Sequence, residues 1–188
     1  INSGIIGSYT DNVSGAVYVP QAGINIDKTA GTENTIVNSG TIAGKTGISS
    51  VVSLAGIVNG AADASGILNM PGGIIVGTDR GISLALGGTI VNEENAEITG
   101  TTGHGIYMIG GSVDNSGTIN GGDASQLNCA IYSTTAEAFV TNHATGTIHG
   151  KRHGVGLYAG GVVTNDGTII SDNATGAALF GTVDAIGR

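Results

Sequence analysis

The sequence has 188 residues, of which 40% are hydrophobic and 11% charged, with 35 glycines and a formal net charge of -8. Six Lys and Arg residues are too few for a nucleic-acid groove, which needs basic side chains clustered over a face. A single cysteine excludes an internal disulfide, and no apolar run approaches the roughly 18 residues that a membrane-spanning helix requires. The length predicts a single domain over 1–188 with one substantial core.

An Asn-centred phrase recurs from one end of the chain to the other, as in VDNSGTING at 113–121 and VTNDGTIIS at 163–171. The commonest interval between phrases is 23 residues, and longer intervals indicate insertions. The anchoring residues are Asn2, Asn38, Asn69, Asn92, Asn115, Asn142 and Asn165.

Three columns of aliphatic residues accompany the phrase. The first, two positions before the Asn, holds Ile36, Ile67, Ile90, Val113, Val140 and Val163. The second, four to six positions after it, holds Ile6, Ile42, Ile74, Ile98, Ile119, Ile148 and Ile169. The third, usually preceded by Gly, holds Val17, Ile48, Ile82, Ile106, Ile131, Val155 and Ala178.

Each period thus contains three short β-prone runs bounded by Gly or Asn, and none is long enough for an ordinary helix. Repetition of these runs in register predicts an all-β fold, a three-sided parallel β-helix of about seven coils. Because alternate residues of a strand share a face, each Asn should point inward with its aliphatic neighbour. Stacked amides can bond one another, so we expect a structural Asn ladder of Asn38, Asn69, Asn92, Asn115, Asn142 and Asn165.

Function on a regular rod is expected where the repeat is interrupted, because insertions project as loops. Enlarged intervals predict protruding segments at about 20–34, 51–65 and 120–128. The first two should form an N-terminal lateral arm that either braces the rod or binds a partner. The candidate partner-binding residues there are Ile24, Ile26, Val52, Leu54 and Ile57.

Outward positions supply the remaining candidates. Tyr107 and Tyr132 should stack on the outer face, where they could hold a sugar ring or a protein partner, or stabilise the coil as a cross-strand pair. The segment HATGTIHGKRHG at 143–154, with Lys151, Arg152 and His153, is interpreted as a local positive spot or a solvated turn.

A further candidate is a column with mixed ligand types. Thr46, Arg80, His104, Cys129 and His153 should stand in one row. A straight row does not converge as a tetrahedral site requires, so no metal and no cofactor are expected.

Three stretches carry a family likeness: IVNSGTIAGKTGI at 36–48, SVDNSGTINGG at 112–122 and GVVTNDGTIISD at 161–172. They resemble the repeats in passenger domains of bacterial type V autotransporters, which form pertactin-like β-helices, and similar phrases occur in filamentous-haemagglutinin-like exoproteins. The likeness covers residues 36–180 and, more loosely, 1–35. It implies a right-handed helix, in keeping with the general crossover preference.

The resemblance also implies a passenger fragment exported across a Gram-negative outer membrane, secreted or displayed, and used in adhesion, aggregation or host-cell contact. The leading hypothesis is an adhesin or host-cell ligand whose receptor is a protein or glycan; a rival is self-association with another copy. An enzyme acting on polysaccharide is the less favoured alternative, because the acids are scattered along the repeat and no GxSxG or HExxH motif is present.

Overall fold

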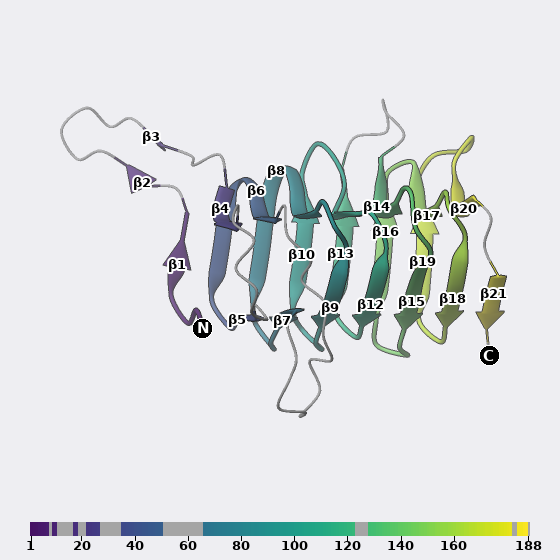
Figure 1. Ribbon diagram of the computed structural model, residues 1–188, viewed down its shortest axis with the longest axis horizontal. Coiled ribbons are helices and arrows are strands. Elements are labelled where there is room, and N and C mark those ends of the chain that lie inside the picture. Colours follow the sequence, from purple (N-terminus) through teal and green to yellow (C-terminus); the bar gives the residue numbers. More distant parts are fainter. Residues whose placement is uncertain are drawn as a thin grey trace.

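The computed structural model describes residues 1–7, 9–10, 17–18, 22–26, 35–50, 66–122, 128–181 and 184–187. In these ranges every regular element is a β-strand, and the strands wind around a rod whose coils stack along its long axis (Figure 1). Strands of neighbouring coils pair in parallel and in register. The parallel β-solenoid predicted from the repeat is therefore confirmed.

The first side of the rod is a seven-stranded parallel sheet in the order β21-β18-β15-β12-β9-β7-β5. Its strands are β5 (Thr35–Asn38), β7 (Gly66–Asn69), β9 (Gly88–Asn92), β12 (Gly111–Asn115), β15 (Ala138–Asn142), β18 (Gly161–Asn165) and β21 (Asp184–Gly187).

The second and third sides belong to one 12-stranded sheet, because two strands run through the corner between them. These are β6 (Thr41–Ser50) and β8 (Ile74–Leu84). The other second-side strands are β1 (Ile5–Ile6), β10 (Glu97–Gly100), β13 (Thr118–Gly121), β16 (Thr147–Gly150) and β19 (Thr168–Ser171). The other third-side strands are β4 (Ala22–Ile26), β11 (Ile106–Met108), β14 (Cys129–Ser133), β17 (His153–Leu157) and β20 (Ala177–Gly181).

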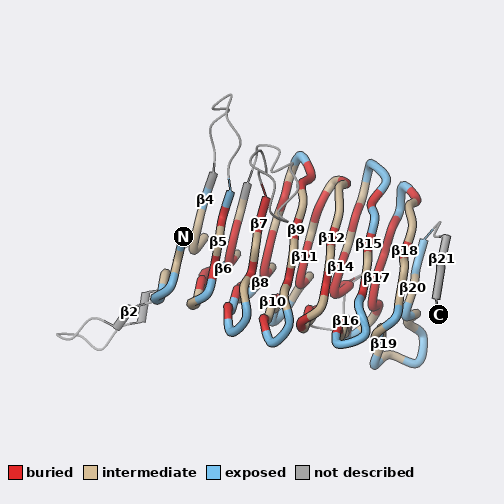
Figure 2. Tube along the Cα trace, turned by 90° about the horizontal axis from the view of Figure 1, so that it is seen from below, coloured by how far each residue is buried: buried red, intermediate tan, exposed pale blue. Residues whose placement is uncertain are grey.

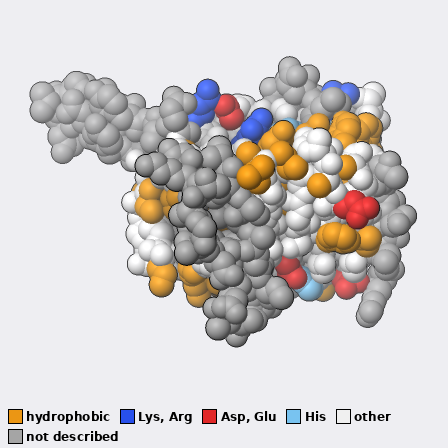
Figure 3. All heavy atoms as spheres, in the orientation of Figure 1, with side chains coloured by type: hydrophobic (Ala, Val, Ile, Leu, Met, Phe, Trp, Pro, Cys, Tyr) orange, Lys and Arg blue, Asp and Glu red, His pale blue; other side chains and the backbone are white. Residues whose placement is uncertain are grey.

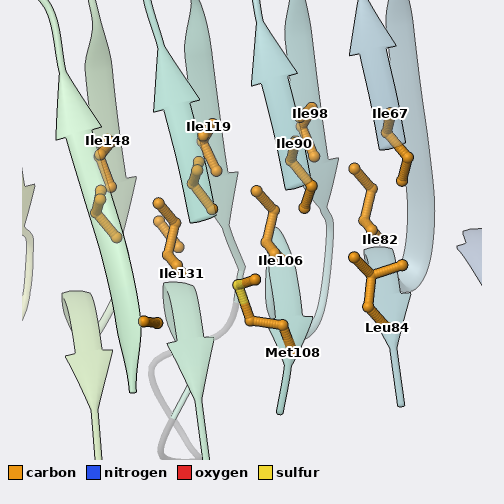
Figure 4. Close-up of a cluster of buried hydrophobic side chains, with 14 of the residues drawn as sticks. Ile67, Ile82, Leu84, Ile90, Ile98, Ile106, Met108, Ile119, Ile131 and Ile148 are labelled. Carbon is orange, nitrogen blue, oxygen red and sulfur yellow. The ribbon is translucent and has the colours of Figure 1, made fainter. Parts of the chain in front are cut away.

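Rows of aliphatic side chains, one from each coil, fill the interior (Figure 4). Ile82, Ile106 and Ile131 are in register on the third side, and all three are fully buried. Along most strands buried residues alternate with partly exposed ones, although β17 is buried throughout, whereas the turns carry most of the exposed residues (Figure 2). Burial of these β-branched rows is the main stabilising term of the fold.

The predicted Asn ladder is confirmed. Asn92 Nδ2 donates to Asn115 Oδ1 at 2.9 Å, and Asn115 Nδ2 donates to Asn142 Oδ1 at 2.8 Å. The same bond joins every consecutive pair from Asn2 to Asn165. Each amide from Asn38 to Asn165 also donates to a carbonyl of its own turn, so burial leaves its donors satisfied.

Two positions in the aliphatic columns were assigned wrongly. In the second column Ile75, and not Ile74, pairs with Ile42 and Ile98, while Ile74 is 39% exposed. The cause is a longer turn: Asn69 bonds the carbonyl four residues on, whereas Asn38 bonds the carbonyl two residues on. In the third column Leu179, and not Ala178, pairs with Val155.

The first coil also differs from the expectation. Ile24 of β4 pairs with Ile48, so Ile24 occupies the third column that was assigned to Val17. Val17 lies instead in an antiparallel hairpin of β2 (Tyr9–Thr10) and β3 (Val17–Tyr18), which is inserted between β1 and β4. The repeat pattern missed this because an apolar strand of the hairpin resembles a coil strand.

The coil number is slightly lower than the seven expected. About five full turns are present, and they lead from Asn38 to Asn165, while the elements outside these turns form incomplete coils. Of the predicted insertions, 51–65 lies outside the described residues, as do 27–34 and 123–127. No membrane-spanning helix occurs in the described ranges.

Candidate functional site

The corner between the second and third sides breaks the inward and outward alternation of the strand. A Cβ atom added to Gly81 would lie 2.9 Å from Cγ2 of Ile98, and one added to Gly105 would lie 3.0 Å from Cγ2 of Ile119. The position just before the third column therefore faces the core and admits only a small residue. Its predecessor, occupied by Arg80 in one coil and His104 in the next, consequently points outward.

An outward line of aromatic and basic side chains results on the third side. The Arg80 guanidinium carbon lies 4.1 Å from the ring centroid of Tyr107. The Tyr107 and Tyr132 centroids are 5.7 Å apart, and His104 stacks on Tyr132 at 4.6 Å with an interplanar angle of 16°. Tyr132 is followed by Tyr158 at 5.0 Å. We call Arg80, His104, Tyr107, Tyr132 and Tyr158 the aromatic line.

The predicted stacking of Tyr107 and Tyr132 is thus confirmed, and it has a consequence for binding. One face of Tyr107 is covered by Arg80 and the other by Tyr132. Tyr132 is in turn enclosed between His104 and Tyr158. Because these contacts occupy the ring faces within the protein, a sugar ring cannot stack flat on either tyrosine.

A shallow hollow of about 370 Å³ adjoins the Arg80 end of the aromatic line. Its lining is mainly polar and comes from four successive coils: Thr46, Asp79, Arg80, Thr102, His104 and Asn128. Gly103 completes the lining, and a Cβ atom there would overlap the carbonyl oxygen of Asp79. We call this depression the corner hollow. Figure 3 shows one face of the molecule, on whose upper part hydrophobic side chains lie beside Lys and Arg.

Two side chains give the corner hollow hydrogen-bond donors. Arg80 Nη1 donates to Ser83 Oγ at 3.3 Å, and none of the ion pairs among the described residues includes Arg80. The Cys129 backbone N–H donates to His104 Nδ1 at 3.0 Å, which places the imidazole hydrogen on Nε2. Burial, with a further contribution from the nearby Arg80 charge, lowers the pKa of His104 to about 4 although the Cys129 bond raises it, so the ring is neutral at pH 7.

One carboxylate lines the corner hollow among the described residues. Asp79 is half-exposed, and its Oδ2 lies 3.5 Å from Nζ of Lys45, an exposed residue beyond the lining. Among the described residues the local balance is therefore two cations, Lys45 and Arg80, against one anion. The surface around the hollow consequently carries a small positive charge, on a chain whose net charge is -8.

The segment at 143–154 is less positive than predicted. Lys151 Nζ and His149 Nε2 both contact the Asp172 carboxylate, at 2.6 and 2.7 Å, and these hydrogen bonds lower the pKa of Asp172. His153 does not belong to a solvated spot at all, because it is only 3% exposed. Burial and the neighbouring Arg152 charge lower the pKa of His153, while its Nδ1 accepts the Ala177 backbone N–H at 3.1 Å.

The residues predicted in the lateral arm have different outcomes. Ile24 is partly buried against the core, so it belongs to the coil and not to an arm. Ile26 lies in the same strand, β4. Val52, Leu54 and Ile57 lie outside the described residues. Their proposed role in partner binding stays a prediction.

Cys129 is in register with His153 in the row that also holds Arg80 and His104, but unlike Arg80 both Cys129 and His153 are buried. Desolvation raises the pKa of its thiol to about 12. No group of three or more His, Cys, Asp or Glu side chains in the described part of the chain is arranged to hold a metal ion.

The sequence placed Arg80 and His104 in one column but missed the corner hollow that they line. The available signal was the uniformly small residue before each third-column aliphatic, as in Gly47, Gly81, Gly105 and Ala130. A small residue at every repeat indicates a core-facing position, and this reverses the direction of the residue before it.

Comparison with family models, with curated proteins and with solved structures finds no match for this chain. The fold alone therefore defines the class of protein, a parallel β-solenoid with an Asn ladder.

Proposed function

We propose that the chain is a segment of an exported bacterial surface or secreted protein that acts by binding, as an adhesin or host-cell ligand. The observation that carries this proposal is the difference between the inward-facing and the outward-facing residues of the coil. Inward residues fill the interior with aliphatic rows and bonded amides, whereas the third side presents the corner hollow with donors directed outward. The autotransporter-like repeat phrases support the exported, Gram-negative setting.

Binding is favoured over turnover by the composition of the corner hollow. Glycoside hydrolysis generally uses a pair of carboxyl groups flanking the scissile bond. Among the described residues that line the hollow, Asp79 is the one carboxylate, and its partner is Lys45. We therefore propose that a bound glycan would leave this protein unaltered.

The test is the binding of the purified, fluorescently labelled chain to host epithelial cells. The proposal expects saturable binding that unlabelled chain competes away, while the protein remains monomeric in sedimentation velocity. Non-saturable adsorption, or release of shortened oligosaccharides from an acidic polysaccharide incubated with the chain, would contradict it.

A second candidate is self-association between rods, and one observation favours it. Leu86 and Phe139 are large apolar residues that are 58% and 50% exposed. Leu86 also lines an open depression of about 280 Å³ with Ile109 and Ala136. If this apolar surface joins copies, the chain should form concentration-dependent dimers that Phe139→Asp abolishes, whereas Ser112→Asp in the adjacent coil should have a smaller effect.

A further inference from the structure

The donors of the corner hollow identify a class of ligand, and this inference rests on the binding function proposed above. A guanidinium group offers five N–H donors in one plane. Stacking on Tyr107 holds the Arg80 guanidinium in a defined orientation, and Ser83 accepts from one terminal nitrogen only. The other N–H groups of Arg80 have no acceptor among the described residues, so they are available to an external anion.

His104 adds a second, fixed donor to the same hollow. Its ring is held on one side by stacking on Tyr132 and at Nδ1 by the Cys129 backbone N–H. Both contacts restrain the ring, and the hydrogen on Nε2, which has no acceptor among the described residues, is the group that a ligand could contact. A planar cation beside a neutral N–H donor matches the two oxygens of a carboxylate in geometry and in charge.

The rest of the lining suits the hydroxyl groups of a sugar. The half-exposed Asp79 carboxylate can accept from hydroxyls, and the Thr46 hydroxyl lies in the same lining. A volume of about 370 Å³ lies in the range of small-ligand sites. A sulfate ester carries the same single negative charge, but its three terminal oxygens form a pyramid, so it matches a planar guanidinium and one fixed N–H donor less closely than the two oxygens of a carboxylate do.

We propose that the corner hollow binds a carboxylate-bearing sugar residue of a glycan, with Arg80 and His104 donating to the carboxylate and Asp79 accepting from sugar hydroxyls. The covered faces of Tyr107 and Tyr132 then serve to orient these donors, and they do not themselves form a sugar platform. Recognition depends on the carboxylate, so a neutral sugar of the same shape should bind poorly.

The test is an NMR titration of the whole chain with an unsulfated oligosaccharide of alternating glucuronic acid and N-acetylglucosamine. The matched ligand is the same oligosaccharide with each carboxyl reduced to a primary alcohol. We expect shifts of the Arg80 and His104 side-chain resonances and at least tenfold weaker binding of the reduced ligand. Equal binding of the two ligands, or tighter binding of a sulfated oligosaccharide without carboxylates, would overturn the proposal.

Variants locate the site. Arg80→Gln should weaken binding of the acidic oligosaccharide at least tenfold, and Arg80→Lys should restore only part of it because a point charge lacks the planar fork. Lys151→Gln removes one exposed positive charge elsewhere on the rod and is the matched control, with binding expected to change less than twofold. Loss of binding in Lys151→Gln with retention in Arg80→Gln would place the site at 143–154 and refute the inference.

Failure of the two proposals can be told apart. Saturable cell binding that the acidic oligosaccharide does not inhibit would refute the ligand class and leave the binding function standing. Binding of the oligosaccharide in the corner hollow without any binding to cells would refute the host-ligand function and leave the subsite intact. The comparison of acidic and reduced ligands needs no variant, so a folding defect in Arg80→Gln cannot obscure the result.

Discussion

Replacement of Asn115 by Ala should destabilise the rod more than any change of similar size on its surface. The Asn115 side chain donates to Asn142 Oδ1 and to the Gly117 carbonyl, and it accepts from Asn92 Nδ2. Truncation therefore leaves three partner atoms in a fully buried setting with one bond fewer each. Because an unsatisfied buried polar group costs about 1–3 kcal/mol, we expect a loss of roughly 3–5 kcal/mol after partial relaxation.

The matched control is Asn120→Ala, in the next strand but on the outside. Asn120 Nδ2 donates to Thr99 Oγ1 at 3.1 Å in a partly exposed position, so its loss should cost less than about 1 kcal/mol. Urea unfolding followed by far-ultraviolet circular dichroism measures both values, with fluorescence as a second probe because solenoids need not unfold in two states. If Asn115→Ala costs no more than Asn120→Ala, the ladder does not contribute as argued.

The remaining predictions concern the corner and its titrating groups. Since the pKa of His104 is about 4 in the folded chain and 6.5 is its ordinary value, unfolding takes up a proton below pH 6.5, and stability should fall as pH drops from 6.5 to 4, by at most about 3 kcal/mol. Comparison with His104→Gln isolates this contribution from the titrating carboxyls, and identical pH profiles for the two proteins would contradict it. Gly105→Val should cost several kcal/mol in the same urea assay, since its Cβ would lie 2.6 Å from the Asn120 carbonyl oxygen; a change below about 1 kcal/mol would show that this corner is not tightly packed. The buried Cys129 thiol, whose pKa is raised to about 12, should react with a thiol reagent at pH 8 only after denaturant is added; rapid labelling of the folded chain would show that the strand opens.

Most of the fold could be predicted because the information is local and repeated. A β-branched residue two positions before an Asn sets the direction of both side chains, and its recurrence sets the register between coils. Asn92, Asn115 and Asn142 could therefore be placed in one buried ladder without coordinates. The errors at Ile74 and Val17 occurred where a turn changed length or an inserted hairpin resembled a coil strand, since the pattern there loses its constant spacing.

The candidate site was harder to predict, because it depends on directions that spacing alone does not fix. Arg80 and His104 could be assigned to one column, but strict alternation would have turned them inward. The small residue before the third column faces the core at this corner, and this turns Arg80 and His104 outward. The stacking of Tyr107 on Tyr132 was predictable from register, whereas the covering of their faces by Arg80 and Tyr158 required the side-chain conformations.

The sequence by itself determined the coil, the aliphatic rows and the amide ladder, because each of these repeats a short pattern whose partners lie one period away. Only the tertiary structure decided which outward residues share a surface. The corner hollow gathers Thr46, Asp79, His104 and Asn128 from four coils, and their proximity depends on small residues at the corner that let the backbones approach. The rod is thus encoded by periodicity, and its candidate binding site by departures from that periodicity.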